Sequence, residues 1–181
     1  MSLTPKRKLR LSEVYRLLEP GPVVLLTTMS KQRPDVMAMS WHTMLEFEPP
    51  LVGCVVSERN HSFASLRSTK ECVINIPGVE LARAVVGCGN CSGRTTDKFA
   101  RFGLTPVAAT KVRAPLVAQC FASLECRVRD TRLVRDYNFF VLEVVAAWIT
   151  RLKRRPRTIH HQGRGVFQVA GRTLTLPSKM K

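Results

Sequence analysis

The sequence predicts a mainly β domain, most simply a closed or partly closed antiparallel barrel with a few short helices. Six or seven short segments are rich in β-branched and apolar residues, and turn-forming Gly and Pro residues separate them. Long helices do not alternate with these segments, which disfavours a doubly wound parallel sheet and favours an antiparallel barrel. The 181 residues suit one domain, which we place at residues 11–150 between a basic arm (1–10) and a basic extension (151–181) that packs on or near the barrel.

The first half of the chain contains a predicted helix and three predicted strands. Ser12 is expected to cap a short helix over residues 12–18. Strands predicted at 23–29 and 36–41 are joined by polar turn residues and form a hairpin. A continuous apolar run predicts a buried strand at 51–56.

The second half of the chain continues the pattern of short elements. The glycine-rich segment 87–93 is expected to form a loop, because its glycines disfavour regular structure. Two long β-type runs, 116–134 and 137–150, are expected to pair around Arg135 and Asp136. The remaining predicted elements are helices at 61–67 and 80–86 and strands at 71–76 and 165–176.

The charge of the chain is strongly unbalanced, with 29 Lys and Arg against 13 Asp and Glu and a formal net charge of +16. After Glu143 there are nine basic residues and no acid. This balance favours an anionic partner, which is a nucleic acid, a membrane surface or a phosphorylated small molecule, although a solvated basic tail explains it as well. Nucleic acid is disfavoured because Phe167 is the only aromatic residue after Trp148. A membrane contact is disfavoured because no amphipathic apolar face accompanies the charge.

The cytoplasm is the default expectation for this sequence, and in a reducing compartment its cysteines need not form disulfides. The basic N-terminus is not followed by an apolar export segment, and no apolar run approaches the roughly 20 residues that span a bilayer. Four of the six cysteines lie in apolar strand-like runs and are expected to be small buried hydrophobes. Cys88 and Cys91 have a metal-like or redox-like spacing, but zinc needs two further ligands and a thioredoxin-like pair needs a long helix. No metal site is expected, and His160 and His161 are interpreted as solvated.

Three segments carry residues suited to binding chemistry. Residues 39–43 combine hydroxyls, backbone amides and an aromatic edge that suit a flat, polar-edged ring, or they form a core strand with a packed Trp. Residues 57–62 place an Arg and two hydroxyls at a helix N-terminus, which suits a phosphate, or they form an ordinary helix cap. Residues 87–93, which lead to Lys98, can close over an anion or form a surface loop.

Taken in order, these segments resemble the flavin reductase-like family, whose members adopt an FMN-binding split barrel, and in particular its flavoredoxin-like branch. The resemblance covers roughly Leu11 to Trp148 and is specific as an ordered set rather than in any one piece. Its marks are PVVLLTT at 22–28, VMAMSW at 36–41, FEPPLV at 47–52, RNHS at 59–62, VINIP at 73–77, SG at 92–93, DKF at 97–99 and GLT at 103–105.

The resemblance implies a homodimer with one FMN per subunit near the interface. The implied contacts to the isoalloxazine ring come from Met39, Ser40, Trp41, His42 and Thr43. The implied contacts to the ribityl phosphate come from Ser57, Arg59, His61 and Ser62. The loop that closes over the cofactor would contribute Cys88, Ser92, Gly93 and Lys98. Cys88 and Cys91 are then structural, or, as the alternative, a thiol lies beside the flavin.

The activity implied by the resemblance is that of an oxidoreductase of the flavin reductase type. NADH or NADPH would reduce the flavin, which would pass electrons to free flavin, a partner protein or a small acceptor, with no acid–base triad required. The alternatives are a non-catalytic flavin-binding electron carrier and, less favoured, a basic nucleic-acid-binding barrel. The chain departs from the family at its end, where residues 154–165 are basic instead of forming a further strand with an aromatic tail.

Overall fold

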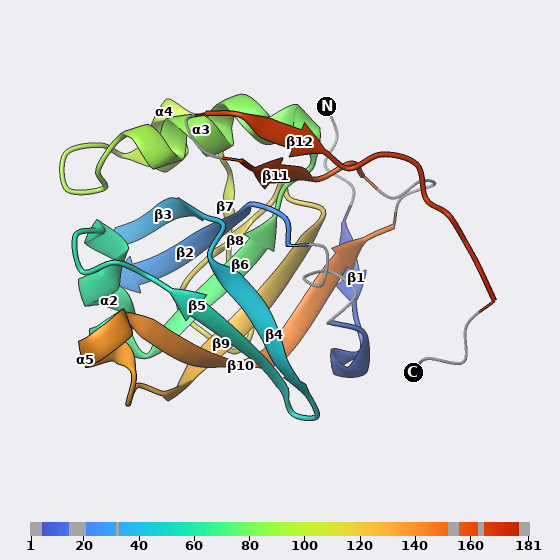
Figure 1. The fold of residues 1–181 in the computed structure, drawn as a ribbon. Helices are drawn as coiled ribbons and strands as arrows, with labels where there is room; N and C mark the ends of the chain where they lie inside the picture. Colours follow the sequence, from blue (N-terminus) through green and yellow to red (C-terminus); the bar gives the residue numbers. More distant parts are fainter. Residues whose placement is uncertain (1–4, 15–20, 32, 152–155, 163–164, 178–181) are drawn as a thin grey trace.

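A curved antiparallel sheet forms the centre of the computed structural model, which describes residues 5–14, 21–31, 33–151, 156–162 and 165–177. Seven strands follow the order β3-β2-β6-β9-β10-β5-β4, and β1 pairs with β10 as the eighth (Figure 1). Every pair of neighbours is antiparallel, so the prediction of a mainly β antiparallel barrel is confirmed. The strands are β1 (Lys6–Lys8), β2 (Val24–Ser30), β3 (Arg33–Met39), β4 (His42–Phe47), β5 (Pro50–Val55), β6 (Glu71–Ile76), β9 (Ala122–Asp130) and β10 (Phe139–Thr150).

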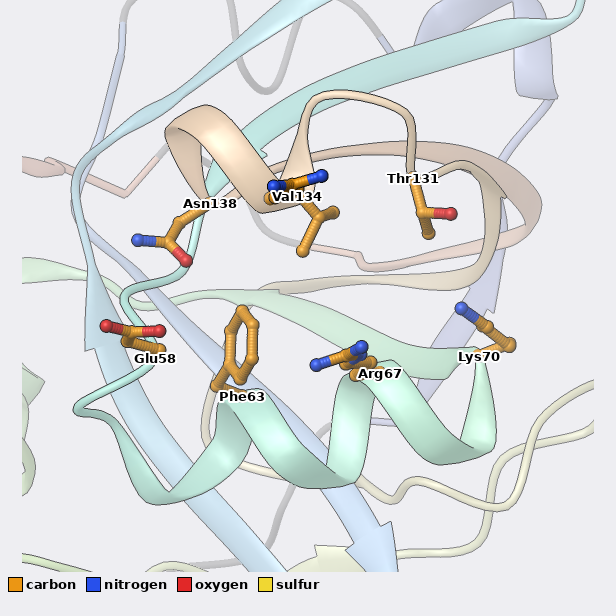
Figure 2. Close-up of a pocket in the computed structure, with 8 residues that line it drawn as sticks. Glu58, Phe63, Arg67, Lys70, Thr131, Val134 and Asn138 are labelled. Atoms are coloured by element: carbon orange, nitrogen blue, oxygen red, sulfur yellow. The ribbon is translucent and has the colours of Figure 1, made fainter.

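Short helices and two small ribbons surround this sheet. In Figure 1, α3, α4 and the β11–β12 ribbon lie over one end of the sheet. Helices α2 and α5 flank another side and border a cavity (Figure 2). These elements are η1 (Leu11–Glu13), α2 (His61–Thr69), η2 (Val79–Leu81), α3 (Ala82–Asn90), α4 (Lys98–Arg101), β7 (Pro106–Val107), β8 (Leu116–Val117), α5 (Val134–Tyr137), β11 (Ile159–His161) and β12 (Phe167–Val169).

The sheet is buried on both faces where β2 crosses it. Leu26 belongs to the main core cluster together with Ile74 and Leu124. Its neighbour Leu25 points to the opposite face and belongs to a second cluster with Val85 of α3. Successive strand residues face opposite sides, so the continuous apolar run of β2 fills two cores. Burial of each such Leu contributes about 1.5–3 kcal/mol relative to an exposed side chain.

Several predicted elements are confirmed with small boundary shifts. The strand at 71–76 is β6, and the hairpin of 23–29 with 36–41 is β2 paired with β3. The strand at 51–56 is β5. The helix at 61–67 is α2, which ends when Lys70 adopts a left-handed conformation with φ of 59°. The helix predicted at 12–18 falls mostly outside the described residues, and its described part contains the 3₁₀ turn η1.

The prediction of a loop at 87–93 is wrong over its first half, because α3 continues to Asn90. Its glycines permit close packing rather than flexibility. A Cβ atom on Gly87 would overlap the ring of Phe102, so only glycine lets that ring approach the helix. Val85 and Cys88 are buried on the same helix. This packing outweighs the helix cost of about 1 kcal/mol for each Gly.

Three strand predictions also differ from the structure. Strand β4 was not predicted, because its apolar side chains Leu45 and Phe47 are exposed rather than facing a core. The two long runs do pair, as β9 with β10. The first of them breaks into β8, a turn and β9, and its end at Val134 starts the helical turn α5. The last predicted strand, 165–176, is regular only in β12.

Both basic ends contact the barrel where they are described. Lys6, in the segment assigned to the basic arm, lies in β1, and its Nζ donates hydrogen bonds of 2.8 Å to Val117 O and 2.9 Å to Ser123 Oγ. Burial lowers the pKa of Lys6 to about 8. In the extension, Ile159 is buried and its carbonyl accepts a 2.8 Å bond from Val23 N. No helix in the described ranges is long and apolar enough to cross a membrane.

Candidate functional site

A groove of about 210 Å³ opens between the start of α2, strand β3 and the segment from α3 to α4. Met37 and Ala38 of β3 lie at its base. The end of α3 and the turn after it form one wall, and the start of α2 forms the other. The groove is lined by seven of the thirteen predicted cofactor-binding residues: Arg59, His61, Ser62, Cys88, Ser92, Gly93 and Lys98.

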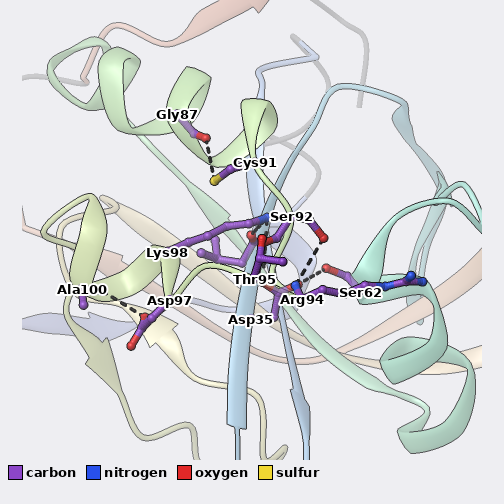
Figure 3. Close-up of polar contacts among 11 residues, drawn as sticks. Asp35, Ser62, Gly87, Cys91, Ser92, Arg94, Thr95, Asp97, Lys98 and Ala100 are labelled. Atoms are coloured by element: carbon purple, nitrogen blue, oxygen red, sulfur yellow. Dashed lines mark hydrogen bonds and ion pairs between the residues drawn. The ribbon is translucent and has the colours of Figure 1, made fainter.

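A buried carboxylate, Asp35 of β3, holds the groove together from below (Figure 3). Ser62 Oγ donates a 2.7 Å hydrogen bond to Asp35 Oδ2. Lys98 Nζ lies 3.8 Å from Asp35 Oδ1 and donates a 2.8 Å bond to Val36 O. A buried charge requires such partners, and here they come from α2 and α4. Sequence reasoning missed Asp35, although an acid before an apolar strand in so basic a chain is a usable signal.

The turn between α3 and α4 is set by its own hydrogen bonds. Ser92 O accepts bonds of 3.2 Å from Thr95 N and 3.1 Å from Thr96 N. Asp97 caps α4 by accepting a 3.1 Å bond from Ala100 N. A Cβ atom on Gly93 would overlap the Asp35 carboxylate, so this position needs glycine for a close approach. The turn therefore packs directly against the Asp35 carboxylate of β3.

The α2 side of the groove has the features of an anion site. Asn60 precedes the helix without a side-chain cap bond, and Phe63 N donates a 3.1 Å bond to Asn60 O. The N–H groups of His61 and Ser62 therefore stay available for another acceptor. A helix N-terminus carries a partial positive charge and binds phosphates readily. The exposed Arg59 has no ion pair with a described residue and can add a charge-assisted bond. Lys98 lines the groove but is already held by Val36 and Asp35.

A second cavity, of about 270 Å³, adjoins the groove. The two share Ala38, Gly89 and Asn90. Met39 and Ser40, both predicted site residues, line the second cavity. His161 and Phe167 of the β11–β12 ribbon also line it, and their ring centroids lie 5.2 Å apart. Sequence reasoning missed these two, although Phe167 is the one aromatic residue of the basic extension.

Four predicted site residues lie outside both cavities. Trp41 is 71% exposed, and Thr43 is exposed on β4. His42 donates through Nε2 to Pro22 O at 2.7 Å, and its Nδ1 is buried without a partner among the described residues. Burial lowers the pKa of His42, an effect that the bond to Pro22 opposes. Ser57 Oγ accepts a 3.3 Å bond from Arg59 N.

The cysteines are all free, and five of the six are buried. Burial raises the pKa of Cys88 to about 12, which leaves it as an unreactive thiol at neutral pH. Cys91 is partly exposed, and its Sγ donates to Gly87 O at 3.3 Å. Among the residues that the structure describes, His, Cys, Asp and Glu side chains form no group of three able to hold a metal ion.

Comparison with known proteins matches this arrangement to one family. The family model described as "Flavin reductase like domain" matches residues 16–169. The protein YddH of Escherichia coli is 34% identical over an alignment of 181 positions, which covers 92% of this chain and 96% of that protein. A protein of Pyrococcus abyssi is 33% identical over 134 residues, 74% of this chain and 77% of that one.

Solved structures share the fold. An FMN-binding domain of a flavin reductases-like enzyme from Shewanella baltica superposes with a TM-score of 0.90 at 24% identity, covering 98% of this chain and 100% of that chain. Flavoredoxin of Desulfovibrio vulgaris (Miyazaki F) has a TM-score of 0.78 at 23% identity, covering 86% and 90%. The sheet described above is therefore a split barrel of the kind found in FMN-binding proteins.

Proposed function

This chain belongs to the family of flavin reductase-like domains, and from this premise we propose that it binds FMN and acts as an oxidoreductase. The observation that carries the proposal is the continuity of two cavities. The groove beside α2 has the features of a phosphate site, and the adjoining cavity between β3, α3 and the β11–β12 ribbon is bounded mainly by apolar groups. A molecule with a phosphate at one end and a flat ring at the other fits such a pair.

The described residues fit FMN in a definite direction. Arg59, His61 and Ser62 with the N–H groups of α2 would hold the phosphate. Met39 and Ser40 would face the ring, and Phe167 would cover it from the ribbon. When bound, FMN supplies hydride and electron transfer through its ring. The protein's part is to bind the phosphate, orient the ring and exclude water with α3 and the ribbon.

A nicotinamide, NADH or NADPH, is the proposed electron donor, and free flavin, a partner protein or a small molecule is the proposed acceptor. The net charge of +16 supports this proposal, because it attracts anionic nucleotides to the molecule. We propose the cytoplasm as the compartment in which the protein acts. A protein that retains FMN but oxidises neither nicotinamide would instead be an electron carrier.

A homodimer is proposed as the working form. Strand β4 is an edge strand that exposes Leu45 and Phe47, and Trp41, just before the strand, is exposed as well. Exposed apolar edges are normally covered. Pairing of two copies through this strand would bury the side chains and bring residues 41–43 toward a cofactor. Sedimentation of the wild-type chain and of a Leu45→Glu/Phe47→Glu variant tests this, and a monomeric wild-type chain would contradict it.

The experiment that tests the function is reconstitution with excess FMN, desalting and an absorbance spectrum. We expect close to one FMN per chain, with retention reduced about tenfold in Arg59→Gln because one charge-assisted bond to phosphate is lost. Arg83→Gln is the matched control, since Arg83 is an exposed arginine on α3 that lines neither cavity. Oxidation of NADH and NADPH by the loaded protein then tests the donor. A protein that neither retains FMN nor protects it from solvent would overturn the proposal.

A further inference from the structure

A cavity of about 340 Å³ lies along a different face of α2 from the flavin groove and shares no lining residue with it. Phe63, Arg67 and Lys70 line it with the spacing i, i+4, i+7, which places them on one side of the helix. Ser62 is the next position round the helix and points instead to Asp35. The opposite wall comes from the turn that contains α5.

The charges around this cavity are uncompensated. Arg67, Lys70 and Arg135 line it against a single acid, Glu58. None of these four side chains forms an ion pair or a hydrogen bond with another described residue. Like charges gathered without a counterion repel one another. An anion that carries two charges would relieve this repulsion and accept charge-assisted hydrogen bonds from Arg67 and Lys70.

The lining also changes in character along the cavity, as Figure 2 shows. Arg67 and Lys70 lie toward one end, and Glu58 and Asn138 lie toward the other. Phe63 stands between them. Its ring packs edge-on against Phe140, with centroids 5.6 Å apart and planes at 71°. The cavity thus presents a cationic end, an aromatic middle and an end able to accept and donate hydrogen bonds.

Two helix ends hold these groups in place. Lys70 ends α2 with φ of 59°, and Asn138 ends α5 with φ of 55°. Lys70 N donates a 3.0 Å bond to Leu66 O, and Asn138 N donates a 2.9 Å bond to Val134 O. The backbone positions of the two polar ends are therefore set before any ligand arrives, which lowers the entropic cost of binding.

We propose that this cavity binds a nucleoside monophosphate, with its phosphate at Arg67 and Lys70 and its base against Phe63. An exocyclic amino group on the base would donate to the Glu58 carboxylate. Inorganic phosphate would satisfy the cationic end but would leave the aromatic middle and the Glu58 end unused. The same chemistry is found in a free nucleotide and in the adenylate half of a nicotinamide dinucleotide.

Titration calorimetry with AMP tests the proposal, on wild-type protein with and without excess FMN. AMP is expected to bind in both conditions, because the cavity and the flavin groove share no residue. Binding is expected to weaken about 100-fold in the Arg67→Gln/Lys70→Gln variant, at about tenfold for each lost charge-assisted bond. Arg83→Gln removes an exposed charge elsewhere and is expected to bind AMP as the wild type does. Circular dichroism confirms that each variant is folded.

Further ligands and one more variant locate the parts of the nucleotide. Ribose 5-phosphate is expected to bind at least tenfold more weakly than AMP, and Phe63→Leu is expected to remove most of that difference because the base can no longer stack on an aromatic ring. NADH that displaces AMP assigns the site to the dinucleotide, and NADH that does not displace it assigns the site to free nucleotides. Absence of AMP binding, equal binding by the double variant, or equal binding of ribose 5-phosphate would overturn the proposal.

Discussion

Asp35 and Glu125 are both buried carboxylates, but different kinds of partner stabilise their negative charges. Glu125 is fully buried and accepts hydrogen bonds from Thr110 N at 3.0 Å and from Trp148 Nε1 at 2.7 Å, with others from Thr110 Oγ1 and Lys111 N. Asp35 is 7% exposed and is held by one hydroxyl, that of Ser62, and by a lysine 3.8 Å away. Glu125 has four donors, two of them backbone N–H groups, from residues 110–111 and from Trp148 of β10. Asp35 instead joins two helices through a single hydroxyl and a lysine.

This contrast separates a buried carboxylate that only stabilises the fold from one that also shapes the flavin groove. Burial raises the pKa of Glu125, but the hydrogen bonds from Thr110, Trp148 and Lys111 outweigh it and leave the pKa below its ordinary value. None of these partners lines the flavin groove. Two partners of Asp35, Ser62 and Lys98, line the groove. Loss of Glu125 should therefore affect stability alone, and loss of Asp35 should affect stability and FMN binding together.

The largest effect on stability is expected from Glu125→Gln. The amide group would face backbone donors that previously met a carboxylate, so unfolding free energy should fall by about 3 kcal/mol. Urea unfolding measures this, with Glu71→Gln as the control, because Glu71 pairs with the exposed Arg113 and should contribute under about 1 kcal/mol. Equal losses in the two variants would contradict the structural role of Glu125.

Asp35→Asn should produce a smaller loss of stability together with a loss of cofactor. Lys98 keeps its bond to Val36 O, so the expected cost is about 2 kcal/mol. The two walls of the groove then lose the carboxylate that holds Ser62 and Lys98 together. FMN affinity should fall about tenfold, the equivalent of one lost charge-assisted bond. Quenching of FMN fluorescence measures the affinity. An unchanged affinity in the folded variant would show that Asp35 is structural in the same sense as Glu125.

Gly93→Ala disturbs the contact between the turn and Asp35 from the side of the turn. Its Cβ would overlap the Asp35 carboxylate, so the turn must shift and FMN affinity should fall several-fold, at a stability cost of about 1 kcal/mol. Gly171→Ala is the matched control, because no atom lies within 4 Å of the place that its Cβ would take and its φ is not positive. Both variants are compared by thermal unfolding and by FMN titration. Identical behaviour would remove the role of the close approach.

The response to acid sharpens the comparison further. The folded pKa of Glu125 lies below its ordinary value of 4.5, so the stability that it contributes is present above that pH and is lost as the pH falls through the folded pKa. Urea unfolding from mildly to strongly acidic pH is therefore expected to show a loss of stability in the wild type that is reduced in Glu125→Gln. Parallel pH profiles for the two proteins would contradict this assignment.

The smallest effect concerns thiol reactivity in the groove. Cys91 is partly exposed and lines the groove, while burial raises the pKa of its neighbour Cys88 to about 12. Iodoacetamide should therefore label Cys91 before any other cysteine, and FMN should slow that labelling. Mass spectrometry of digested samples locates the label. Labelling of Cys88 at a similar rate would show that the end of α3 opens in solution.

Local sequence signals were enough to predict several elements of the fold. The apolar run of β6, the β2–β3 hairpin and the start of α2 were all predicted, because turn residues and β-branched runs act within a few positions. The order of the motifs indicated the family, which the family model confirms. The site assignments taken from that resemblance remain predictions, although the structure brings nine of the thirteen residues into two adjoining cavities.

Other features depend on contacts between residues that are distant in the sequence, and no local signal predicts them. Gly87 lies within α3, although glycine locally favours a loop, and the ring of Phe102 packs where a Cβ atom on Gly87 would lie. Strand β4 depends on its pairing with β5, because only His42 and Met44 are half-buried and its other residues are exposed. Asp35 meets Ser62 across 27 positions of the chain, and Phe167 reaches the cavity beside β3 from the far end of the sequence. Such contacts arise from global packing, which no short window of sequence contains.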